Sequence, residues 1–224
     1  MKNIVALSAL VIATAVSQSF GRFTYSVLYI EIRDDFGLSN TAAGGIGSLN
    51  LVGYLIGSLL VAFTIGNFGL IKTAKYGLAG VVIGLLLLSW SPNSFITLLA
   101  LFLTGLSAAG VWITTPALAT NLLGPDRKGL AIGWVTTGVG LGFFAACVFD
   151  AVITDWRSVY GLETIIGFAA LGLLVLTITT SENPASGSGL SPTALKQIPG
   201  WLNLCVTYGF FAVSVSLAMT FSAA

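Results

Sequence analysis

Seven long apolar segments follow one another along the chain and limit strongly how it can fold. They cover residues 4–30, 41–65, 73–90, 94–123, 129–153, 159–179 and 201–224. A helix needs about 20 predominantly apolar residues to cross the hydrocarbon core of a bilayer. Because backbone polar groups cannot stay unpaired in lipid, such segments are expected to be helices. The pattern therefore predicts an all-α, polytopic membrane protein whose surroundings are the lipid bilayer.

Composition excludes most other classes of protein. Charged residues make up only 8% of the chain, whereas soluble domains carry about 25%. The net charge of +1 gives no reason to expect a nucleic-acid partner. Histidine is absent, and Cys147 and Cys205 both lie in apolar segments, so we expect no metal site and no cofactor. No acids, bases and nucleophiles converge at membrane depth, so a membrane enzyme is not expected either.

A region rich in proline, glycine and serine divides the chain at residues 181–200, and this composition is typical of a linker. We expect residues 1–180 to form a six-helix transmembrane domain. Residues 181–200 would be a cytoplasmic linker, and residues 201–224 the first helix of a second half. With the N-terminus inside, six Lys and Arg residues fall in inner segments and two in outer segments. This bias predicts a cytoplasmic N-terminus.

Arg22 is the only charged side chain within the first apolar segment. A cation at that depth costs about 2.5 kcal/mol or more unless it has a partner, water or a route to the surface. Its side chain can extend to the lipid headgroups, pair with an acid such as Glu163 or Asp150, or bind an anionic group of a solute. The same segment imitates a secretory signal peptide, but its apolar run continues past the cleavage-like site Ala15-Val16-Ser17.

The second apolar segment combines small and polar residues at helical spacing. Gly53 and Gly57 are one turn apart, which lets a neighbouring helix approach closely. Asn50 and Tyr54 are also four residues apart and therefore share a face. This amide and this phenol can bind a solute or hydrogen-bond to another helix, and the sequence leaves both interpretations open.

The fourth apolar segment carries Trp112, Thr115 and Pro116 near its middle. Pro116 removes a backbone hydrogen bond and frees the carbonyl of Trp112. This predicts either a simple kink or a hinge beside a polar cavity. The fifth segment contains three alternating glycines, Gly138, Gly140 and Gly142. Since no strand precedes them, close helix packing and bending explain them better than a nucleotide-binding loop.

Six motifs stand out: Gly21-Arg22-Phe23-x-Tyr25, Gly47-Ser48-x-Asn50-x-x-Gly53-Tyr54-x-x-Gly57, Gly129-x-Ala131-x-Gly133-Trp134, Gly138-x-Gly140-x-Gly142, Asp155-Trp156-Arg157 and Thr220-Phe221. With the six-segment layout, the short basic inner loops and the linker, they resemble the major facilitator superfamily (MFS). Within it, the chain looks most like the YbfB/YjiJ group of bacterial transporters. The resemblance extends over essentially the whole chain.

The resemblance implies a secondary active transporter of the bacterial inner membrane that moves a small organic solute by alternating access. It implies two inverted three-helix repeats, in keeping with Ile46-Gly47 and Ile132-Gly133, which lie 86 residues apart. The first and fourth helices would line the cavity. Arg22 would hold an anionic group of the solute. Hydrogen bonds and apolar walls would come from Tyr25, Asn50, Tyr54, Trp112 and Thr115.

The chain departs from the superfamily in its motifs and in its length. The loop at residues 66–72 lacks the usual Asp and first Arg, so proton coupling would need Glu31, Asp150 or Glu163. A complete transporter has two six-helix halves. We therefore expect an N-terminal part whose missing C-terminal half belongs to a longer chain or to a partner. The alternative is a non-transporting, truncated membrane module or scaffold that packs with another membrane protein.

Overall fold

The computed structural model describes residues 2–179 and, beyond them, residues 199–203, 206, 207, 210 and 214. Most of the predicted linker at 181–200 and of the predicted helix at 201–224 lies outside these residues. The elements from α1 to α7 are all helical, which confirms the predicted all-α class. Among the described residues, five helical stretches are long and apolar enough to cross a membrane.

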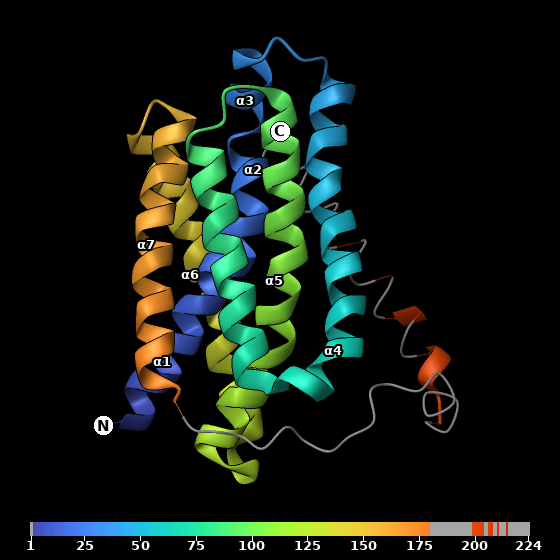
Figure 1. Ribbon diagram of the computed structural model, residues 1–224, viewed down its shortest axis with the longest axis vertical. Helices are drawn as coiled ribbons and strands as arrows, with labels where there is room; N and C mark the ends of the chain where they lie inside the picture. Colours follow the sequence, from blue (N-terminus) through green and yellow to red (C-terminus); the bar gives the residue numbers. More distant parts are fainter. Residues whose placement is uncertain (1, 180–198, 204–205, 208–209, 211–213, 215–224) are drawn as a thin grey trace.

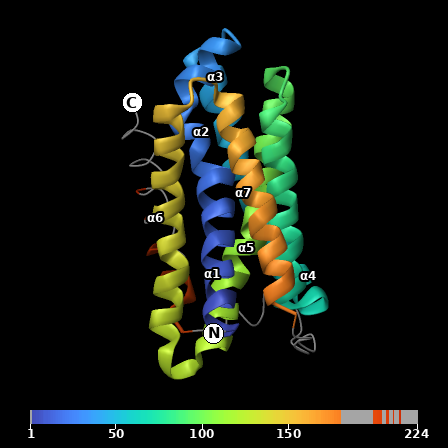
Figure 2. The same ribbon diagram turned by 90° about the vertical axis from the view of Figure 1, so that its left-hand side faces the viewer.

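The long helices run side by side along the long axis of the molecule (Figure 1). The first stretch consists of α1 (Lys2–Thr14), η1 (Ala15–Phe23) and α2 (Thr24–Val27), and the short α3 (Tyr29–Asp35) follows it. The others are α4 (Asn40–Ser89), α5 (Ser94–Leu123), α6 (Lys128–Val152) and α7 (Trp156–Thr177), and the single turn η2 (Pro125–Arg127) precedes α6. Figure 2 shows α1 between α6 and α7, and α1 contacts both.

The long element α4 consists of two helices that meet at Gly69. Gly69 has φ +74° and ψ 167°, a backbone conformation that glycine adopts far more readily than residues with a Cβ. Figure 1 shows α4 descending, turning back and rising again beside α5. The predicted segments 41–65 and 73–90 thus correspond to two arms of α4, 40–68 and 70–89.

The first stretch differs from the expected single α-helix over residues 4–30. It ends at Val27, because Leu28 has a non-helical ψ of 10°. Its middle, Ala15–Phe23, is a π-helix, in which the backbone N–H of Thr24 donates to the carbonyl of Ser19, five residues earlier. Such segments are rare, occur often at functional sites and widen the helix locally. Here the π-helix carries Gln18 and Ser19, which bond to α5 and α6.

Glycines bring the helices into close contact on two sides of the bundle. A Cβ added at Gly53 or Gly57 would overlap the backbone carbonyls of Phe102 or Leu106 on α5. Likewise, a Cβ at Gly138 would overlap the carbonyl of Val11 on α1. We refer to the contact of Gly53 and Gly57 with α5 as the glycine seam.

The other two glycines of the fifth segment have different surroundings. A Cβ at Gly142 would lie 2.7 Å from the Ser19 hydroxyl oxygen, so Gly142 belongs with Gly138 to the α6 contact with the first stretch. A Cβ added at Gly140 would meet nothing within 4 Å. Gly140 therefore makes no close helix contact with the described residues, and its packing or bending role stays a prediction.

The predicted repeats differ at one pair of equivalent residues. Asn50 and Thr136 occupy equivalent positions at the 86-residue offset. Asn50 is buried and bonded to two other helical elements, whereas Thr136 is exposed and donates to Ile132 of its own helix. The inverted-repeat arrangement stays a prediction.

A charged cluster ties three elements together at the end of the bundle where α3 lies. Arg157 donates to the carboxylate of Asp35 at 2.8 Å and to the carbonyl of Ser91 at 2.9 Å. The indole N–H of Trp156 reaches the same Asp35 oxygen at 3.3 Å. Trp156 and Arg157 therefore connect α7 to α3, and Arg157 also connects it to the α4–α5 loop.

Candidate functional site

The π-helix η1 brings polar side chains into the middle of the bundle. Ser17, Gln18 and Ser19 are buried, and Arg22 is half-buried. Gln18 donates to the carbonyl of Ala108 on α5 at 3.1 Å, and Ser19 donates to the carbonyl of Val139 on α6 at 2.7 Å. These bonds fix η1 between α5 and α6.

Arg22 contacts Gln18 and Phe23 of its own helix and Tyr54 of α4. Its Nη1 donates to Gln18 Oε1 at 2.9 Å. Its guanidinium carbon lies 3.9 Å from the centroid of the Tyr54 ring and 5.4 Å from that of Phe23, close enough for cation–π attraction. The structure thus brings together Arg22 and Tyr54, two of the predicted site residues.

Glu163 and Asp150 interact with groups other than Arg22. The described residues contain two ion pairs, Arg33 with Asp34 and Arg157 with Asp35. Glu163 accepts a hydrogen bond from Thr24 at 2.7 Å. Neither of these two ion pairs, which are those of the described residues, joins Arg22 to Glu163 or Asp150.

Asn50 serves to join helices. Its amide nitrogen lies 2.9 Å from the carbonyls of Gly21 and Leu101 and 3.0 Å from the Thr104 hydroxyl. The side chain is only 3% exposed. Both amide protons therefore bond to η1 and α5. Of the two interpretations that the sequence left open for Asn50, these bonds correspond to a hydrogen bond with another helix.

Tyr25 is likewise engaged inside the bundle. Its hydroxyl donates to the carbonyl of Ala43 at 2.8 Å. The ring occupies space that glycine leaves open, since a Cβ at Gly47 would lie 2.6 Å from it. Tyr25 therefore fixes the start of α4 against α2.

The predicted residues of α5 lie along the side that contacts the first stretch. Trp112 is half-buried and follows Ala108, the acceptor of Gln18, by one turn, so both lie on the same face. Thr115 is buried and accepts from the Thr14 hydroxyl at 3.2 Å. α5 continues through Pro116 as one helix.

Sequence patterns do not predict Gln18, Thr24 or the depth of Glu163. The signal for Gln18 was the polar run Ser17-Gln18-Ser19 inside an apolar segment, which is costly in lipid unless it faces protein or water. Glu163 lies seven residues inside α7 and is fully buried. No group of three potential metal-binding side chains occurs among the residues that the structure describes.

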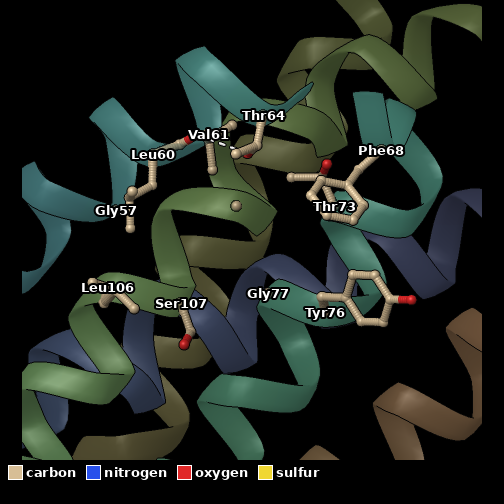
Figure 3. A pocket seen from close by; sticks show the side chains of 11 residues that line it. Gly57, Leu60, Val61, Thr64, Phe68, Thr73, Tyr76, Gly77, Leu106 and Ser107 are labelled. Carbon is tan, nitrogen blue, oxygen red and sulfur yellow. Dashed lines mark hydrogen bonds between the residues drawn. The ribbon is translucent and has the colours of Figure 1, made fainter. Parts of the chain in front are cut away.

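A pocket of about 210 Å³ lies elsewhere, between the two arms of α4 and α5 (Figure 3). Its lining includes Val61, Phe68, Thr73, Tyr76 and Ser107, with no charged side chain. Figure 3 shows Phe68 and Tyr76 at one side of it. Because it offers hydroxyls and apolar groups alone, it is not suited to an ionic solute.

A family model described as Major Facilitator Superfamily matches residues 11–224. Monocarboxylate transporter 9 of Pongo abelii is 28% identical over 148 residues, which cover 66% of this chain and 29% of that protein. Uncharacterized transporter YgaY of Escherichia coli O157:H7 is 29% identical over 142 residues, which cover 60% of this chain and 35% of that protein. The chain thus spans about a third of the length of these curated relatives.

One solved structure shows the same fold. A crystal structure of the peptide transporter POT in complex with sulfate is similar with a TM-score of 0.63 at 18% identity. The match covers 96% of this chain and 46% of that one. The likeness extends over nearly all of the described helices.

Proposed function

The chain belongs to the Major Facilitator Superfamily, and we propose that it is the N-terminal part of a secondary active transporter for a small organic anion. Transport would proceed by alternating access, with the solute bound between this part and a C-terminal half. The chain is a multi-pass membrane protein, and we place its N-terminus in the cytoplasm of a bacterial cell on the basis of the Lys and Arg distribution. Its place in the YbfB/YjiJ group stays a prediction.

The observation that carries the proposal is the position of Arg22. The guanidinium is held on the Tyr54 ring and on Gln18, half-buried and within a membrane-spanning stretch. A guanidinium presents five donors in a planar fork that matches a carboxylate. Gln18 accepts from Nη1 of this guanidinium at 2.9 Å. One curated relative is named a monocarboxylate transporter, which agrees with this class of solute.

Within the predicted set, the structure supports a division of roles. Arg22, Tyr54 and Trp112 would contact the solute, since Tyr54 stacks on Arg22 and Trp112 is half-buried on the α5 face that contacts η1. Tyr25, Asn50 and Thr115 would hold the walls of the site in place, because their polar atoms bond to neighbouring helices. With α4 counted as two crossings, the described helices would form the six-helix half that the family implies.

The test is uptake of small carboxylates into proteoliposomes by the full-length transporter that contains this chain. A charge-assisted hydrogen bond contributes about 1.5–3 kcal/mol, so Arg22→Ala should lower uptake about 10- to 100-fold. Arg33→Ala is the matched control, because Arg33 bonds to Asp34 and Asn40 outside the apolar stretches. Unchanged uptake in folded Arg22→Ala would refute the role of Arg22. Absence of all transport would favour the alternative, a membrane scaffold.

A further inference from the structure

Four side chains form a row across the bundle, from α4 through η1 to α6. The guanidinium carbon of Arg22 lies 3.9 Å from the centroid of the Tyr54 ring on α4 and 5.4 Å from that of the Phe23 ring. The Phe23 ring in turn contacts Phe143 of α6, with the ring centroids 6.4 Å apart and the ring planes at 86°. We call Tyr54, Arg22, Phe23 and Phe143 the aromatic row.

The packing of η1 on α6 fixes the two phenylalanines of the row. Phe23 is the last residue of η1 and follows Ser19, whose hydroxyl donates to the carbonyl of Val139 on α6 at 2.7 Å. Phe143 follows Val139 by four residues, so the two lie on the same face of α6. The edge-to-face contact of Phe23 with Phe143 is thus set about one turn from the hydrogen bond between Ser19 and Val139.

Every member of the aromatic row is half-buried. Arg22 also lies within the first membrane-spanning stretch, where contact of a cation with lipid tails is costly. Because the rings of Tyr54 and Phe23 adjoin this cation, the accessible part of the row suits a ligand that carries both a negative charge and an apolar ring.

A second pair of phenylalanines joins the same two elements in a different setting. The ring centroids of Phe20 on η1 and Phe149 on α6 are 6.0 Å apart. Phe20 is only 4% exposed and belongs to the hydrophobic core, and Phe149 packs against that core. This pair therefore serves the packing of η1 on α6, whereas the pair of Phe23 and Phe143 adjoins the guanidinium through Phe23.

We propose that the transported solute is an aromatic carboxylate and that Phe23 and Phe143 select its ring. This inference rests on the proposed function, because it places the carboxylate of the solute on Arg22. Aromatic rings prefer edge-to-face or offset-stacked contacts with centroids about 4.5–7 Å apart. In benzoate the ring is bonded directly to the carboxylate, so a carboxylate on Arg22 brings the ring beside Phe23.

The test compares two solutes of the same charge that differ in the ring. Initial uptake of benzoate and of cyclohexanecarboxylate is measured at neutral pH in proteoliposomes with the full-length transporter that contains this chain, and uptake by protein-free liposomes is subtracted. We expect the unmodified protein to prefer benzoate by about 2- to 10-fold, the effect of one aromatic contact beyond its buried area. In Phe143→Leu the ratio of the two uptake rates should fall to about 1.

Phe149→Leu is the matched control. It removes a ring from the same contact between η1 and α6, six residues or about 9 Å along α6 from Phe143. The preference for benzoate should remain in this variant. A ratio of uptake rates separates ring recognition from packing, because a general loss of folded protein lowers the uptake of both solutes equally.

Each outcome decides for or against the ring site. Equal uptake of the two solutes by the unmodified protein would overturn it and leave the proposed function intact. An unchanged preference in folded Phe143→Leu, or the same loss of preference in Phe149→Leu, would overturn it as well. If Phe143→Leu does not fold, the same ratio in Phe23→Leu decides. Uptake of neither solute would refute the proposed function and this inference together.

Discussion

Substitution of Gly57 by alanine tests how the bundle is packed. A Cβ at this position would overlap the backbone carbonyl of Leu106, and a backbone group cannot rotate away as a flexible side chain can. The first arm of α4 would have to separate from α5. Overpacking of a close-packed interior costs about 1–3 kcal/mol, and we expect a loss of stability in this range at the glycine seam.

Gly140→Ala is the matched control. Both positions lie within helices, so both variants gain the higher helix propensity of alanine, about 1 kcal/mol. Gly140 has nothing within 4 Å of an added Cβ. The difference between Gly57→Ala and Gly140→Ala therefore isolates the steric overlap, and it should amount to about 1–3 kcal/mol.

The assay is equilibrium unfolding of the purified chain in mixed detergent micelles, followed by circular dichroism or tryptophan fluorescence. Gly53→Ala should behave like Gly57→Ala, because its Cβ would overlap the carbonyl of Phe102. Equal stabilities of Gly57→Ala and Gly140→Ala would refute the glycine seam. A larger loss at Gly140 would locate the close contact on α6 instead.

Two further predictions concern polar groups. Asn50→Leu should lower the free energy of unfolding by about 1–3 kcal/mol, because it removes the side-chain donor to the carbonyl of Gly21 and one of two side-chain donors to that of Leu101. In the same unfolding assay, Ser48→Ala should change the free energy of unfolding by less than about 0.5 kcal/mol, since the Ser48 hydroxyl bonds to Gly44 of its own helix. A similar loss of stability in Asn50→Leu and Ser48→Ala would contradict the role of Asn50. Burial, then the charge and hydrogen bond of Asp150, raise the pKa of Glu31 above its ordinary value of 4.5. The folded state then binds this proton more tightly than the unfolded state, so the contribution of Glu31 to stability is present below pH 4.5 and is lost as the pH rises through the raised value. Melting temperatures across this range should fall less steeply in Asp150→Asn, and an unchanged slope would show that Asp150 does not act on Glu31.

The helices were predictable from sequence because each apolar segment must satisfy its backbone internally in lipid. The segment 94–123 agrees with α5 at both ends, since Asn93 caps its start and Gly124 follows its end with a positive φ. The first stretch was not predictable to the same extent. Apolar residues continue to residue 30, whereas the helix ends at Val27, because hydropathy does not report the local change in ψ at Leu28.

The contacts of the candidate site were less predictable than its location. Spacing placed Asn50 and Tyr54 on one face, but it could not show that Asn50 is used by Gly21, Leu101 and Thr104 while Tyr54 supports Arg22. Those contacts depend on the π-helical geometry of η1 and on the close approach of α5. Neither the π-helix nor the close approach of α5 can be recognised from the types of residue in a single sequence.

The central claim is that Arg22 recognises the negative charge of a solute. The most direct measurement is uptake by the full-length transporter of a carboxylate and of its neutral amide, in the unmodified protein and in Arg22→Gln. We predict that the unmodified protein prefers the carboxylate by about 10-fold or more, as expected for a charge-assisted contact. Arg22→Gln should lose this preference and still carry the amide. An unchanged preference for the carboxylate in Arg22→Gln would contradict the account.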